Sequence, residues 1–133
     1  MRKAGIAGTA IALVLAVAAP AQAVVAAAVP GSYGAGWATP VIVTRVGGPV
    51  TVANTDIAPH HLVAAETFLP KKKAKKAPWC EGYPAKRCPV FWSETVTTGQ
   101  RVSVQGLEYI KSGEQYPFVC TIHANMTGVL VGI

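Results

Sequence analysis

Short apolar runs rich in β-branched residues alternate with turn-forming residues over most of this chain. Glycine and proline separate the runs, as in Gly47-Gly48-Pro49. No stretch after residue 30 has a good helical period. The runs predicted to be strands are residues 40–46, 50–54, 61–65, 91–97, 101–105, 115–120 and 127–133. The pattern therefore predicts an all-β chain, built as a β-sandwich or a small barrel.

The beginning of the chain has the pattern of a secretory signal peptide rather than of a folded element. Arg2 and Lys3 precede an apolar stretch at residues 6–19, and Ala21-Gln22-Ala23 is a small-x-small cleavage site. A transmembrane anchor is the alternative, but Pro20 and Gln22 interrupt the stretch that it would need. We therefore expect cleavage of residues 1–23 and an exported protein, located in the periplasm, at the cell surface or outside the cell.

The remaining chain divides into three parts by composition. Residues 24–36 contain Ala, Gly and Pro without periodicity, which predicts a flexible lead-in. Residues 37–133 hold the predicted strands and have the length of one domain. Within them, residues 71–89 carry lysines, prolines and two cysteines, and we interpret this segment as an insertion in the sheet pattern.

The charge of the protein is concentrated in that insertion. The chain has 12 Lys and Arg against 6 Asp and Glu, and five of the basic residues are Lys71, Lys72, Lys73, Lys75 and Lys76. A nucleic-acid binder usually spreads its basic residues along a face, so this distribution argues against that class. The run is either a solvated loop or a docking surface for an acidic redox partner or an anionic membrane.

The three cysteines are predicted to have two different roles. Cys80 and Cys88 lie close together in the insertion, and in an exported protein they are the natural disulfide. We interpret the bond as a staple for a long loop, with a redox switch as the alternative. Cys120 is then left over at the end of an apolar strand, and an odd thiol needs a reason of its own.

The residues around Cys120 provide a metal-binding pattern. Cys120, His123 and Met126 follow the spacing C-x2-H-x2-M, which places a thiolate, an imidazole and a thioether on one loop. Copper accepts two histidines and a cysteine with a weak axial methionine, whereas zinc has little use for a thioether. The second histidine must come from elsewhere, and His60 and His61 are the remaining two. The sequence therefore predicts one copper ion.

With these motifs, the chain resembles the small blue copper proteins, the cupredoxins, and within them the plastocyanin, pseudoazurin and amicyanin group. The resemblance covers residues 37–133 without the insertion. It rests on Asn54-x-Asp56 with Pro59-His60, and on Tyr116-x-Phe118-x-Cys120-x-x-His123-x-x-Met126. It implies an all-β Greek-key β-sandwich, here with one long disulfide-stapled loop, and a type 1 copper site near one end.

The resemblance also assigns the ligands. The first histidine ligand of the family follows a proline, which corresponds to His60, and the others correspond to Cys120, His123 and Met126. The family usually has asparagine after the first histidine, where its side chain ties the two ligand loops together. This chain has His61 there, so the tie is in question and His61 is a rival ligand.

The function that the resemblance implies is one-electron transfer rather than catalysis. It implies a carrier between a redox protein donor and an acceptor, and we expect the protein to be a monomer. His123 would reach the surface within an apolar patch that includes Ile57, Ala58 and Ala124, and would pass the electron. The alternative function is copper binding or delivery without redox turnover. One copper site and a short chain leave no room for a multicopper enzyme.

Overall fold

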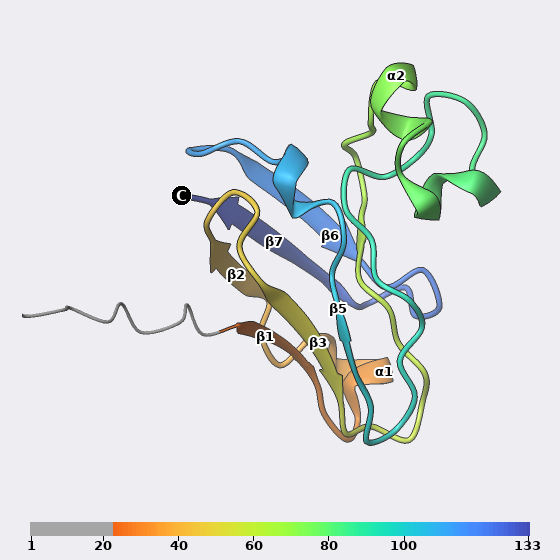
Figure 1. The fold of residues 1–133 in the computed structure, drawn as a ribbon. Coiled ribbons are helices and arrows are strands. Elements are labelled where there is room, and N and C mark those ends of the chain that lie inside the picture. Colours follow the sequence, from red (N-terminus) through yellow and green to blue (C-terminus); the bar gives the residue numbers. More distant parts are fainter. Residues whose placement is uncertain (1–22) are drawn as a thin grey trace, which may run out of the picture.

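The computed structural model describes residues 23–133, and these form two β-sheets that pack against each other (Figure 1). One sheet has the order β1-β3-β5, with strands Val24–Ala28, Val50–Asn54 and Arg101–Ser103. The other has the order β2-β7-β6-β4, with strands Val41–Thr44, Thr127–Gly132, Gln115–Val119 and Val63–Ala64. The predicted β-sandwich is confirmed.

Period-two alternation explains how the sheets enclose one core. In β3, Val50 and Val52 are buried, and in β6 Tyr116 and Phe118 are buried, while Pro117 between them is half-buried. Successive side chains of a strand point to opposite faces, so each strand contributes every second residue to the interior. Leu130 of β7 completes this part of the core and is fully buried.

The predicted strand at residues 91–97 is wrong as a continuous element. Trp92 makes only isolated bridges, to Gln105 and to Val63, and Val96 makes only one, to His60. Between them the Ser93 hydroxyl accepts a hydrogen bond from the Leu62 N–H at 2.8 Å. A side-chain oxygen thus takes the place of a backbone carbonyl and interrupts the ladder.

The flexible lead-in predicted for residues 24–36 is also wrong. Residues 24–28 form β1, which pairs in parallel with β3 so that Ala26 lies opposite Val52. The short helix α1, Ser32–Ala35, follows it. Alanine has a low strand propensity, so the sequence pattern underestimated a segment whose pairing partner lies more than 20 residues away.

The predicted insertion is a separate protrusion, which we call the lysine hump and define as residues 71–89. It contains α2, Lys71–Ala74, and a 3-10 helix, η1, Pro78–Gly82; a second 3-10 helix, η2, Leu107–Tyr109, lies outside the hump. Figure 1 shows α2 and η1 standing apart from the two sheets. The predicted disulfide between Cys80 and Cys88 is confirmed, and it closes the hump.

The hump and residue 60 lie at opposite ends of an irregular ribbon. The bridges His60 to Val96 and Phe68 to Pro89 mark its two ends. Ten residues separate His60 from Pro70, which in extended chain is up to about 30 Å.

In the part of the chain that the structure describes, no helix is long and apolar enough to cross a membrane. The predicted signal peptide lies outside the described residues, apart from residue 23.

Candidate metal centre

The loop that follows β3 is held by the side chain of Asn54. Its amide nitrogen donates hydrogen bonds to the Ala58 carbonyl at 2.8 Å and to the Val96 carbonyl at 2.9 Å. Its amide oxygen accepts from the Asp56 N–H at 2.8 Å. Because Asn54 is buried, these bonds fix the path of residues 54–58 and with it the position of His60.

His60 is fully buried and has one ring nitrogen without a partner. Its Nε2 lies 2.8 Å from the Asp56 carboxylate, and in the neutral ring Nε2 is the donor of this hydrogen bond. Its Nδ1 is then a bare lone pair, and it is the sole buried side-chain nitrogen or oxygen without a hydrogen bond among residues 23–133. An unpaired buried acceptor costs free energy unless a ligand uses it, so in the neutral ring Nδ1 is available to a metal.

Asp56 is buried as well, and several donors stabilise its charge. Burial is the largest influence and would raise the pKa of the carboxyl group. Hydrogen bonds from His60, Ile57 N–H and Gly31 N–H outweigh it, so the pKa of Asp56 is below its ordinary value. The carboxylate stays ionised and orients the His60 ring, as carboxylates do for metal-binding histidines. Asp56 belongs to the motif Asn54-x-Asp56, but this role was not predicted from it, although its position four residues before His60 was a usable signal.

The second loop joins β6 to β7 and contains the C-x2-H-x2-M motif. The Cys120 N–H donates to the Met126 carbonyl at 2.9 Å, and the Met126 N–H donates to the His123 carbonyl at 3.1 Å. The thiol of Cys120 is free and buried, and the Met126 side chain is fully buried. These backbone bonds close the loop on itself, so the three motif residues lie on one tight turn.

His123 comes from this loop and packs beside His60. The centroids of the two rings are 4.9 Å apart. Its Nε2 lies 3.2 Å from the carbonyl oxygen of Pro59, which can only accept, so Nε2 carries the proton. The Nδ1 of neutral His123 is then unprotonated, as it is in His60. Both imidazoles therefore have the tautomer in which Nδ1 can bind a metal.

His61 connects the two loops. Its Nε2 accepts a hydrogen bond from the Thr121 N–H at 3.1 Å, and the Thr121 hydroxyl lies against the same nitrogen. The lone pair of neutral His61 is used in this contact. Burial lowers the pKa of His61, which favours the same neutral form. His61 thus makes the tie that the family makes with asparagine, and this geometry favours His60 as the ligand.

The segment that follows β1 covers the site from a third side. Trp37 is buried, and its indole N–H donates to the Met126 carbonyl at 3.2 Å. Its ring also lies 6.3 Å from the His60 ring, centroid to centroid. The Tyr33 ring lies 6.3 Å from His123, and a Cβ on Gly36 would be 3.2 Å from the Asn125 carbonyl oxygen. None of these three residues was predicted, because nothing local marks them as neighbours of a loop near the C-terminus.

The structure thus places four predicted ligands in two adjoining loops: His60, Cys120, His123 and Met126. Among the described residues, no group of three His, Cys, Asp or Glu side chains forms a ready cluster for a metal ion. The two imidazoles and the loop that carries the thiol are adjacent, and the lysine run of the hump lies outside the site.

Comparisons with known proteins give structural neighbours alone. No family model and no curated protein matches the chain. A purple cupredoxin from Nitrosopumilus maritimus is 16% identical, with a TM-score of 0.55 over 83% of this chain and 99% of that chain. Amicyanin from Paracoccus versutus is 22% identical, with a TM-score of 0.52 over 86% and 85%. A reduced mutant form of amicyanin is 19% identical, with a TM-score of 0.54 over 87% and 86%. Together with the two sheets and their disulfide-closed loop, these likenesses show that the chain has the cupredoxin fold.

Proposed function

We propose that this protein is an exported one-electron carrier with a single type 1 copper ion held by His60, Cys120, His123 and Met126. The observation that carries the proposal is the unpaired, buried Nδ1 of His60, whose ring lies 4.9 Å from the ring of His123, centroid to centroid. The solved amicyanin structures include reduced, oxidised and Cu(I) forms. Copper bound here would supply the Cu(II)/Cu(I) couple for one-electron transfer.

The residues of this chain support that role by holding the ligands in fixed positions. Asp56 orients His60, the Pro59 carbonyl orients His123, and Trp37 fixes the Met126 carbonyl. A rigid donor set that suits both oxidation states needs little rearrangement when an electron moves. The buried surroundings of Cys120 and Met126 keep water from the thiolate and the thioether.

His123 is the group through which we propose that electrons enter and leave. Its side chain is half-buried, and the two loops around it expose Ile57 and Ile122, with exposed fractions of 83% and 44%. An exposed apolar rim around a ligand is suited to brief contact with a partner protein. We propose that the redox donor and acceptor dock at this end of the molecule, whether or not their surfaces are acidic.

Metal loading tests the proposal directly. The protein loaded with Cu(II) is expected to show an intense visible thiolate charge-transfer band and a type 1 EPR spectrum. Cys120→Ser should abolish the band, since the thiolate is its source. His60→Ala should damage the site, whereas the matched variant His61→Ala should keep the colour. A blue Cys120→Ser variant, or loss of the site in His61→Ala alone, would contradict the ligand assignment.

Copper delivery is the second candidate function, and electrochemistry separates it from electron transfer. A carrier gives a reversible Cu(II)/Cu(I) wave and keeps Cu(I) in the presence of a competing chelator. A delivery protein releases Cu(I) to the chelator soon after reduction. The same variants apply to both measurements, because both functions need the same ligands.

A further inference from the structure

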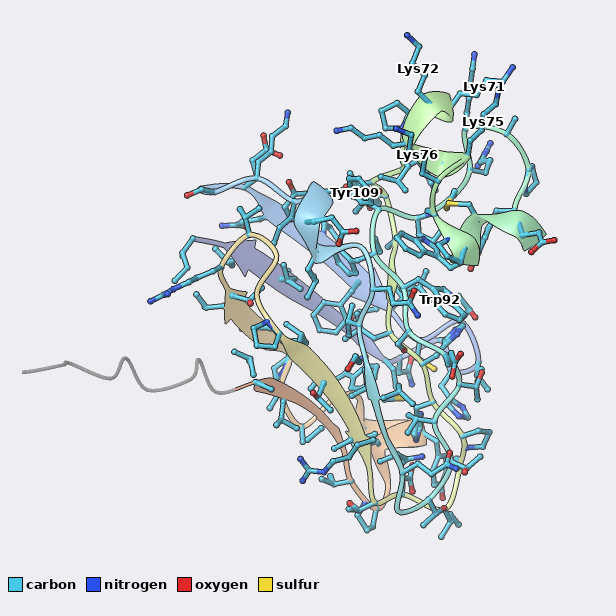
Figure 2. All side chains as sticks on the ribbon, in the orientation of Figure 1. Lys71, Lys72, Lys75, Lys76, Trp92 and Tyr109 are labelled. Atoms are coloured by element: carbon cyan, nitrogen blue, oxygen red, sulfur yellow. A yellow bond between two sulfur atoms is a disulfide. The ribbon has the colours of Figure 1, made fainter. Side chains whose placement is uncertain are left out.

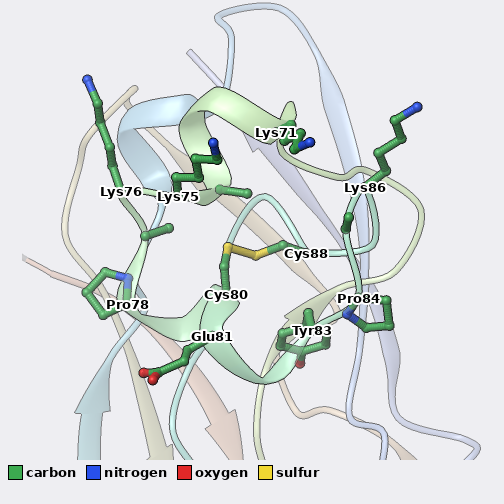
Figure 3. A pocket seen from close by; sticks show the side chains of 13 residues that line it. Lys71, Lys75, Lys76, Pro78, Cys80, Glu81, Tyr83, Pro84, Lys86 and Cys88 are labelled. Carbon is green, nitrogen blue, oxygen red and sulfur yellow. A yellow bond between two sulfur atoms is a disulfide. The ribbon is translucent and has the colours of Figure 1, made fainter.

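The lysine hump contains a cavity of about 540 Å³ that is separate from the candidate metal centre. Its walls come from α2, η1 and residues 83–88, and the Cys80–Cys88 disulfide forms part of the lining (Figure 3). Small-molecule sites in proteins usually have volumes of about 300–1,000 Å³. The cavity therefore has the size of a site for a small organic molecule.

The structure divides the lysine run between this cavity and the outer surface. Lys71, Lys75 and Lys76 line the cavity, and Lys86 joins them from beyond η1. Lys73 instead lies over the Tyr109 ring, 5.6 Å from its centroid. Lys72 does not line the cavity; Figure 2 shows it at the outer end of the hump. The five lysines are thus not one uniform patch.

The ammonium groups around the cavity have no carboxylate partners. Among residues 23–133 no lysine or arginine side chain forms an ion pair with a carboxylate. Glu81 also lines the cavity, and Figure 3 shows it at the edge opposite the lysines. Four lysines against one glutamate leave three net positive charges around one concave surface. Such a surface attracts an anion with more than one negative charge.

Lys86 provides an independent observation. It is the one residue other than glycine with a positive φ in the described chain, at 64°. This left-handed conformation favours glycine, so a lysine here carries a conformational cost. Such strain is typically retained where the side chain has a function. The function that fits its place is to add a fourth positive charge at the edge of the cavity (Figure 3).

The remaining lining is apolar and suits the body of an organic molecule. It is formed by Ala74, Ala77, Pro78, Tyr83 and Pro84. We propose that this cavity binds an organic phosphate ester, with the phosphate nearest Lys71 and Lys75, Lys76 and Lys86 flanking it on either side (Figure 3), and the carbon skeleton against Tyr83 and the prolines. Lysine binds phosphate as a point charge, which needs no fixed orientation. The proposal is independent of the copper assignment.

Calorimetric titration of the copper-loaded protein with ATP, in the absence of magnesium, tests the site. ATP combines a ring with several phosphates, and adenosine is the uncharged control. We expect saturable binding of ATP and none of adenosine. Lys75→Gln should weaken binding about tenfold, and the matched variant Lys72→Gln, which removes the same charge outside the cavity, should bind as the wild type. Equal weakening by both variants, or no saturable binding of ATP, would overturn the proposal.

Lys86→Gly separates the proposed role from a merely structural one. Glycine relieves the left-handed backbone, so Tm should stay equal or rise, while ATP binding weakens about tenfold. Unchanged ATP binding in this variant would contradict the proposal. Vesicles of phosphatidylglycerol identify the source of the ester. They compete with ATP if a lipid headgroup is the natural ligand, and they do not if it is a soluble ester.

Discussion

The N-terminal segment, residues 24–37, and the lysine hump, residues 71–89, look alike in sequence but differ in the folded protein. Both are rich in turn-forming residues. The first precedes the predicted strands, and the second interrupts them. The first pairs with β3 and reaches the candidate metal centre through Gly31 and Trp37. The hump stands apart, with exposed lysines and its own disulfide.

The difference lies in what each segment contacts rather than in its local pattern. Gly31 reaches Asp56 across 25 positions, and Trp37 reaches Met126 across 89. The disulfide of the hump spans 8 positions. The N-terminal segment is tied to the metal centre by long-range contacts, whereas the hump joins the core only at its base, through Ala77, Cys80 and Cys88. Changes in the two regions should therefore have different consequences for the copper site.

The largest effect is expected at Trp37. Trp37→Ala removes a buried ring that packs against Phe118 and beside His60. Truncation of a buried aromatic residue costs about 3–5 kcal/mol, and the copper spectrum should change as well, since the bond to Met126 is lost. Denaturant unfolding and the visible spectrum measure the two effects. Trp37→Phe, which keeps a ring without the N–H, should lie between the wild type and Trp37→Ala. If Trp37→Ala has the stability of the wild type, the prediction that the N-terminal segment supports the site is contradicted.

An intermediate effect is expected from opening the hump. The double variant Cys80→Ala/Cys88→Ala should lower the free energy of unfolding by about 2–3 kcal/mol, because the reduced chain gains loop entropy when unfolded. The visible copper spectrum should not change, since the disulfide lies outside the metal centre. Cys120→Ser is the control with the opposite pattern: it loses the spectrum and keeps the disulfide. A shifted copper band in the double variant would show that the two regions are coupled.

The smallest effect is expected at Tyr116 of β6, which lines the same surface pocket as Lys73 of the hump. Burial is the main cause that raises the pKa of Tyr116, and Glu114 adds to it. The folded state therefore favours the neutral phenol. Its contribution to stability is complete below the unfolded pKa of about 10 and is lost as pH rises through the folded pKa. Tyr116→Phe should make unfolding less sensitive to pH above about 10, measured by denaturant midpoints across alkaline pH. An unchanged alkaline slope would contradict this.

Much of the candidate site could be predicted from the sequence because its information is local. The C-x2-H-x2-M motif lies within seven consecutive residues, and Pro59-His60 follows Asn54-x-Asp56 after two residues. Such motifs need no knowledge of distant segments. The strands at residues 50–54 and 115–120 could also be predicted, since alternation with a period of two is a property of neighbouring residues. The strand at residues 91–97 could not, because the Ser93 hydroxyl competes with the backbone for the Leu62 N–H.

By itself, the sequence determined the all-β class, the Cys80–Cys88 pair and the set of candidate ligands. The tertiary structure alone decided that residues 24–37 belong to the core and that His61 ties the loops. It also decided that the lysine run divides between a cavity and open surface. The physical reason is that these features depend on free energies between remote groups, such as the Asp56 carboxylate and the Gly31 N–H. A sequence pattern records which groups a segment carries, but only the folded chain decides which of them meet.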